Sequence, residues 1–234
     1  MNVLLVTSIT LALVHTLIGV DHYLPFIVLG QANNWSIKKT MLIVLMCGIG
    51  HVTVSVALGF AGIALSSGAE ILIGIENLRG IISTYFLIAF GFVYTLYGIR
   101  QVMKNKTHSH ITVDGQTLMH AHLKNGEGHE HGGHHPDSKR SKNVFWGLFI
   151  LLVLGPCEPL IPIIMYPAAM HNTFMLVSVT LSFAFFTIAT MLLMTFLGLK
   201  GVRMFKFSKL EKYSHVLAGS SVLACGILVL ALPI

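Results

Sequence analysis

Charged residues are scarce in this chain. Only 10% of its 234 residues are Asp, Glu, Lys or Arg, against roughly a quarter in soluble proteins. Hydrophobic residues make up 54%, and the mean hydropathy is +0.78. These values exclude a soluble globular enzyme, and the apolar content also excludes a disordered chain. We therefore predict an all-α polytopic membrane protein without enzymatic activity.

Cysteine is also scarce, which limits the redox chemistry. Cys47, Cys157 and Cys225 are the only three cysteines, and they form no CxxC motif. This pattern excludes a module built on disulfides. A nucleic-acid partner is not expected either, because the net charge of +6 is concentrated in a few segments rather than spread over a folded basic face.

Long apolar segments fill most of the chain. A transmembrane helix needs about 20 apolar residues, and six segments meet this requirement: 3–29, 41–65, 80–102, 144–169, 173–199 and 213–233. We therefore expect six transmembrane helices in two three-helix halves, 1–103 and 144–234. A polar segment, 104–143, connects the halves.

The two halves share a short motif. Asp21 begins the sequence DHYLPFIV and Glu158 begins EPLIPIIM, so each acidic residue is followed four residues later by proline. Three helices in each half make the halves antiparallel, as in the inverted repeats of many secondary transporters. Glycine and proline near both motifs predict broken helices at the membrane midplane; these residues are Gly19, Pro25, Gly155, Pro156, Pro159 and Pro162.

Basic residues indicate the orientation. Every one of the 15 lysine and arginine residues except Arg79 lies in or beside the connections that follow the first, third and fifth predicted helices. By the positive-inside rule, these connections face the cytoplasm and both termini lie outside. The expected location is the inner (cytoplasmic) membrane, with the lipid bilayer as the surrounding partner.

The connection at 104–143 is rich in histidine and glycine. Its low apolar content predicts a disordered cytoplasmic loop, and clustered imidazoles are typical ligands of late first-row metal ions. The alternative is a solvated linker whose histidines have no role. The loop histidines are His108, His110, His120, His122, His129, His131, His134 and His135.

Ionisable residues also occur inside the predicted helices, where a charge costs at least about 2.5 kcal/mol and usually serves function. His15 and His22 are seven residues apart and share a helix face, as do Cys47 and His51, which are four apart. We predict a metal site made of His15, Asp21, His22, His51, Cys157 and Glu158, with Cys47, Thr187 and Thr190 as secondary candidates.

Each of these residues also has a structural interpretation. Asp21 and His22 could be an ion pair that only fixes helix packing. Cys47 and Cys225 could be small packing residues, and Thr187 and Thr190 could bond to their own backbone. His171 and His215 fall near predicted helix ends, where contact with water suffices to explain them.

Several motifs together resemble the nickel and cobalt transporter superfamily, especially its six-helix, urease-accessory-like branch. They are HTLIGVDHYLPF, GIGH, the His-rich loop, GPCEPLIP and TIATMLLM, and they span nearly the whole chain. The resemblance implies transport of Ni²⁺ or Co²⁺ along a path that includes His15, Asp21, His22, Gly50 and His51. Here five residues separate His15 from Asp21, whereas the family pattern has four.

GPCEPLIP also resembles the GPC-type motif of the thiol electron carriers of cytochrome maturation. Those carriers need a reactive cysteine in both halves, but Val20 occupies the position equivalent to Cys157. A transmembrane thiol-disulfide carrier and a metal-delivery accessory protein without transport remain the alternatives.

We expect a secondary transporter that moves Ni²⁺ or Co²⁺ by alternating access, with Zn²⁺ and Fe²⁺ as further candidate ions. No prosthetic group is expected. A cytosolic metallochaperone is a candidate partner.

Overall fold

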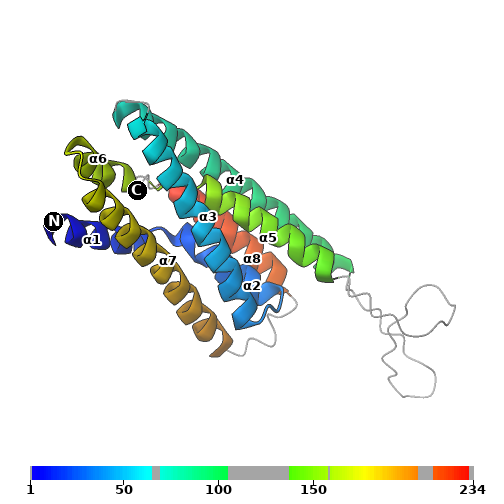
Figure 1. Cartoon of the computed structure of the whole chain (residues 1–234). Coiled ribbons are helices and arrows are strands. Elements are labelled where there is room, and N and C mark those ends of the chain that lie inside the picture. The colour runs from blue at the N-terminus through cyan, green and yellow to red at the C-terminus, as the bar shows by residue number, and fades with distance from the viewer. Residues whose placement is uncertain (1, 65–68, 105–136, 158, 205–212, 232–234) are drawn as a thin grey trace, which may run out of the picture.

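The computed structural model of the chain describes residues 2–64, 69–104, 137–157, 159–204 and 213–231, and every regular element in these ranges is helical (Figure 1). The predicted all-α fold is therefore confirmed. The elements are α1 (Asn2–Ile18), the 3₁₀ helix η1 (Val20–His22), α2 (Leu24–Ala32), α3 (Ile37–Ala64), α4 (Ala69–Lys104), α5 (Asp137–Leu154), α6 (Leu160–Ala169), α7 (Thr173–Met204) and α8 (Ser214–Ala231).

The chain is a multi-pass membrane protein. Among the described residues, 4 helices are long and apolar enough to cross a membrane, namely α3, α4, α7 and α8. Helix α1 passes the same test only together with η1 and α2, across a bend of 81°, which gives up to 5 spans. The predicted segment 144–169 is divided between the apolar part of α5, Asn143–Leu154, and α6, and both of these pieces are too short to pass the test.

The third predicted segment, 80–102, begins later in the sequence than the helix that the structure shows. Helix α4 begins at Ala69 and contains both Glu76 and Arg79. These two charged residues lie three apart on one helix face and form an ion pair, so the helix continues through them. The predicted bounds leave Arg79 in the connection between segments 41–65 and 80–102, and this was wrong, because Arg79 lies inside α4.

The helix ends that flank the basic segments of the sequence gather at one end of the bundle. Helices α2, α4 and α7 end there, and α3, α5 and α8 begin there (Figure 1). We call this the basic end. The opposite end is where α3 meets α4 and α6 meets α7 along the chain.

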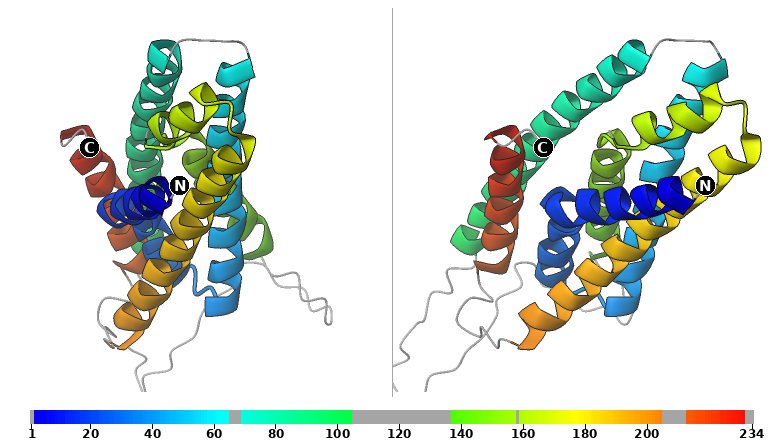
Figure 2. Two further views of the ribbon diagram at one scale, coloured as in Figure 1. Left: turned by 60° about the vertical axis from the view of Figure 1, so that its left-hand side comes forward. Right: turned by 90° about the vertical axis from the view of Figure 1, so that its left-hand side faces the viewer.

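Both helices predicted to break are interrupted. The first breaks at Gly19, after which η1 and α2 turn away from α1, so that α1 lies across the bundle while α2 runs along it (Figure 2). The second breaks after Leu154, and α6 begins at Leu160. Since Pro156 and Pro159 lack the N–H group that a helix needs, the second break follows directly from the sequence.

Helices α4 and α8 pack closely through glycine. A Cβ atom at Gly91 would lie 2.4 Å from the backbone nitrogen of Leu223, and one at Gly219 would lie 2.4 Å from that of Thr95. Small residues let two helix backbones approach in this way. Cys225 of α8 is buried in the same cluster as Leu87 of α4, as its interpretation as a small packing residue predicts.

Replacing Gly91 with alanine should therefore destabilise the fold. The added methyl group has no space between the two backbones, and overpacking of this kind costs about 1–3 kcal/mol. We expect a lower midpoint of thermal unfolding for the purified protein. Gly74→Ala is the matched control, because a Cβ atom at this α4 position meets nothing within 4 Å. Equal midpoints for the two variants would contradict the close packing.

Candidate functional site

The break between α5 and α6 orients His51. In a regular helix the Leu152 carbonyl would accept a hydrogen bond from residue 156, but Pro156 has no N–H group. The Leu152 oxygen instead accepts hydrogen bonds from the Gly155 backbone at 3.1 Å and from the Nδ1–H of His51, which is fully buried on α3, at 2.8 Å. Because a carbonyl oxygen can only accept, the proton must be on Nδ1. The Nε2 atom of His51 is therefore left with a free lone pair.

The break at Gly19 orients His22 in the same way. The Nδ1–H of His22 faces two acceptors, the Gly19 carbonyl at 3.1 Å and the Asp21 carboxylate at 3.3 Å. This arrangement also places a proton on Nδ1, so that the neutral form of the ring carries its lone pair on Nε2. A histidine that binds a metal commonly has its other ring nitrogen held by a carbonyl or carboxylate group in this way.

Three imidazoles gather between the two breaks. The ring centroids of His15 and His22 are 4.9 Å apart, and those of His22 and His51 are 5.1 Å apart. The Nε2 atoms of all three are buried and have no hydrogen-bond partner among the residues that the structure describes. Buried polar atoms are nearly always paired, so three unpaired ring nitrogens in one place indicate a site for a ligand.

The second break adds a sulfur donor to this group. One ligand atom each from His15, His51 and the fully buried Cys157 lie within 4.8 Å of one another. These residues come from α1, from α3 and from the segment between α5 and α6. Nitrogen and sulfur donors of these types bind late first-row metal ions.

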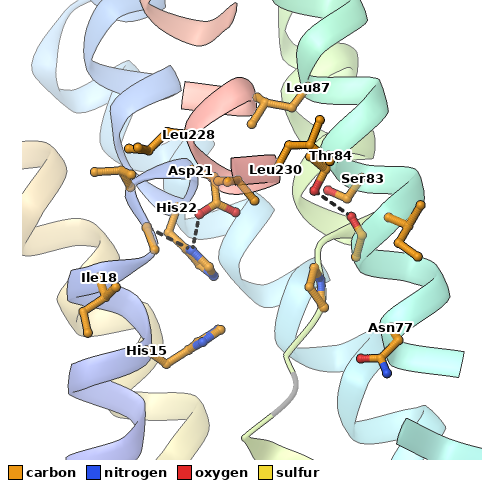
Figure 3. A pocket seen from close by; sticks show the side chains of 16 residues that line it. His15, Ile18, Asp21, His22, Asn77, Ser83, Thr84, Leu87, Leu228 and Leu230 are labelled. Atoms are coloured by element: carbon orange, nitrogen blue, oxygen red, sulfur yellow. Dashed lines mark hydrogen bonds and ion pairs between the residues drawn. The ribbon is translucent and has the colours of Figure 1, made fainter. Parts of the chain in front are cut away.

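A pocket of about 410 Å³ reaches this cluster from one side (Figure 3). His15, Asp21 and His22 lie on one wall, and Asn77 and Thr84 of α4 lie on the other. The Asp21 side chain is 19% exposed, which leaves part of its carboxylate open to the pocket. The pocket therefore offers one anionic group to an entering cation.

The remaining predicted site residues lie elsewhere or are not described. Cys47 packs in a hydrophobic cluster with Val44 and Met191, and Cys157 belongs to a different cluster. Thr190 donates to the Phe186 carbonyl at 2.7 Å, as its structural interpretation predicts. The buried Thr187 hydroxyl has no partner among the described residues. Glu158 and the eight loop histidines lie outside the described residues.

The two histidines near helix ends have ordinary surroundings. His171 is exposed in the turn between α6 and α7. His215, at the start of α8, contacts the Tyr94 hydroxyl at 3.1 Å. Neither belongs to the three-residue group of His15, His51 and Cys157.

Sequence reasoning missed a buried ion pair beside the site. Glu76 is 1% exposed, and its Oε2 atom accepts a hydrogen bond from the backbone nitrogen of Cys157 at 3.1 Å. Arg79 pairs with Glu76 and donates to the carbonyls of Val153 and Gly155, both at 2.9 Å. The available signal was the acid-base spacing of three residues within an apolar segment.

Comparison of the chain with family models, with curated proteins and with solved structures found no match.

Proposed function

We propose that the protein is a secondary transporter of a divalent transition-metal ion, with Ni²⁺ or Co²⁺ as the first candidates. The observation that carries this proposal is a cluster of three buried imidazoles whose Nε2 atoms have no partner among the described residues, two of which, His15 and His51, lie close to the Cys157 thiol. Such a donor set lies inside a multi-pass membrane protein, at two broken helices. Broken helices of this kind form the substrate sites of many secondary transporters.

The donor types favour a late first-row ion over Mg²⁺ or Ca²⁺, which prefer oxygen ligands. His15, His51 and Cys157 would bind the ion, with the thiol deprotonated on binding. His22 would contribute its free Nε2 atom as the groups close around the ion. Asp21 holds His22 and supplies negative charge.

The matching breaks support alternating access between two antiparallel halves. The first half comprises α1 to α4 and the second comprises α5 to α8, so each half begins with a broken helix. The metal cluster takes His15 and His51 from the first half and Cys157 from the second. Relative movement of the halves would therefore open or close the site. The positive-inside rule would place the basic end in the cytoplasm.

Metal flux into proteoliposomes tests the proposal. Ni²⁺, Co²⁺, Zn²⁺ and Fe²⁺ would each be offered to the wild type and to a variant carrying both His51→Ala and Asp21→Asn. We expect the wild type to carry at least nickel or cobalt and the double variant to carry neither. Absence of flux for all four ions, with correctly folded protein in the vesicles, would reject transport of these metals.

A smaller change at Gly19 should weaken metal binding without removing any donor. A Cβ atom here would lie 2.6 Å from Nδ1 of His22, so alanine must displace the imidazole ring. We expect Gly19→Ala to lower metal affinity about 10–100-fold, as other losses of ligand orientation do. Titration with Ni²⁺ measures the effect. Gly201→Ala, where a Cβ meets nothing within 4 Å, should bind as the wild type does; equal affinities for both variants would contradict the predicted crowding.

A further inference from the structure

Side chains of α4 hold several backbone groups at the break between α5 and α6. Arg79 donates hydrogen bonds to the carbonyls of Gly155 and Val153. In a regular helix the Gly155 carbonyl would accept from residue 159, but Pro159 has no N–H group. The N–H group of Cys157, which would serve Val153 in a regular helix, instead donates to Glu76. Two residues of α4 therefore hold three backbone groups of residues 153–157.

Arg79 also connects this segment to a third helix. Its Nη1 atom donates to Ser55 of α3 at 3.3 Å and to Glu76. Each charge of the pair is thus compensated by the other and by polar groups of neighbouring elements. Removing one partner of such a pair leaves the other charge buried and uncompensated, which is costly. The packing of residues 153–157 against α4 consequently depends on both Glu76 and Arg79.

Two pockets border this arrangement. The larger one reaches His15, Asp21 and His22. A smaller one, of about 210 Å³, is lined by Ile73, Glu76, Asn77, Ile161 and Pro162. Asn77 borders both pockets. Because α4 begins at the opposite end of the bundle, the smaller pocket lies nearer to that end than the larger one does.

Glu76 contacts both the smaller pocket and Cys157. Its side chain lines that pocket and also accepts the hydrogen bond from the Cys157 backbone, while Cys157 itself is fully buried. We propose that Glu76 and Arg79 form a latch that closes the metal cluster to the opposite end of the bundle. Release of the latch lets residues 153–157 move away from α4, which opens Cys157 to the smaller pocket.

The latch depends on the proposed function only in that the proposed function names a metal ion as the species that passes the latch. Its two residues are positioning residues, since they act on Cys157 and His51 through the backbone of residues 152–157. The reactivity of Cys157 toward a membrane-impermeant maleimide reports opening without any metal. Cys47→Ser with Cys225→Ser leaves Cys157 as the sole reporter, and Cys47→Ser with Cys157→Ser leaves Cys225 as a reference on α8.

Labelling is compared with and without Glu76→Gln, with reagent added to one face of sealed proteoliposomes at a time. We expect Cys157 to react about tenfold faster or more from the face of the opposite end, the shift that loss of one hydrogen bond to a charged group gives. The rate from the basic face, and the Cys225 rate, should not change. Glu70→Gln, an exposed carboxylate on the first turn of the same helix, is the matched control and should change neither rate.

An unchanged Cys157 rate would overturn the latch. So would an equal increase at Cys225 or from both faces, because general loosening of the fold would produce it. If Glu76→Gln does not fold, Arg79→Lys serves instead, since lysine keeps the charge but lacks the planar fork that binds two carbonyls, and it is judged by the same criteria. Failure of Ni²⁺ to slow labelling of Cys157 would count against the metal site alone, because the latch is judged from metal-free rates.

Discussion

Replacing His51 with alanine is expected to reduce metal flux to the level of empty vesicles. His51 is fully buried, and its protonated Nδ1 is fixed by the Leu152 carbonyl, so its free Nε2 atom points toward the cluster in a defined orientation. Loss of this group removes one of the three residues whose ligand atoms lie within 4.8 Å. We expect metal affinity to fall by more than about 100-fold, beyond the range for residues that only orient ligands.

The control for this experiment is His171→Asn. It removes an imidazole that is exposed in the turn between α6 and α7, where the backbone φ is 49°, a value that asparagine tolerates well. This variant should transport metal at the wild-type rate. If His51→Ala folds and retains wild-type flux, His51 does not bind the transported ion.

Replacing Asp21 with asparagine should also stop transport, through a different cause. The carboxylate accepts a hydrogen bond from the His22 ring and lines the pocket that leads to the cluster. Asparagine keeps a similar shape but removes the negative charge, so a divalent cation enters a pocket without its compensating charge. We expect metal affinity to fall about 10–100-fold and flux to fall with it.

Glu70→Gln provides the comparison for Asp21→Asn, because it makes the same carboxylate-to-amide change at an exposed position of α4. Binding is measured by titration with Ni²⁺, and flux in the same vesicles. A folded Asp21→Asn variant with wild-type affinity and flux would show that Asp21 serves only helix packing, the structural interpretation that the sequence also allows.

Sequence patterns were sufficient to predict the helical class and the two breaks. Composition excluded a soluble fold, and the glycine and proline residues around positions 19 and 156 predicted where the first helix of each half is interrupted. The start of α4 could not be predicted from hydropathy. Glu76 and Arg79 lower the hydropathy of that segment, and only their mutual pairing and their contacts with the neighbouring break keep them inside the helix.

Sequence patterns also predicted part of the candidate site. Helical spacing predicted that His15 and His22 share one helix face, but the helix breaks at Gly19 between them, and their rings lie 4.9 Å apart across the bend. Their nearness to His51 and Cys157 depends on how three elements pack. The Nδ1–H tautomer of His51 depends on a carbonyl 101 residues away along the chain. Cys47 shares a face with His51 by spacing, yet it packs in the cluster of Val44 and Met191.

The absorption spectrum of the Co²⁺-loaded protein tests the central claim most directly. A thiolate bound to Co²⁺ gives a charge-transfer band in the near ultraviolet, and the His-rich segment 104–143 cannot imitate it because it contains no cysteine. We predict a band that rises during titration of the full chain, persists in Cys225→Ser, and disappears in both Cys157→Ser and His51→Ala. Absence of the band from the wild type, or its persistence in Cys157→Ser, would contradict a metal site at the two helix breaks.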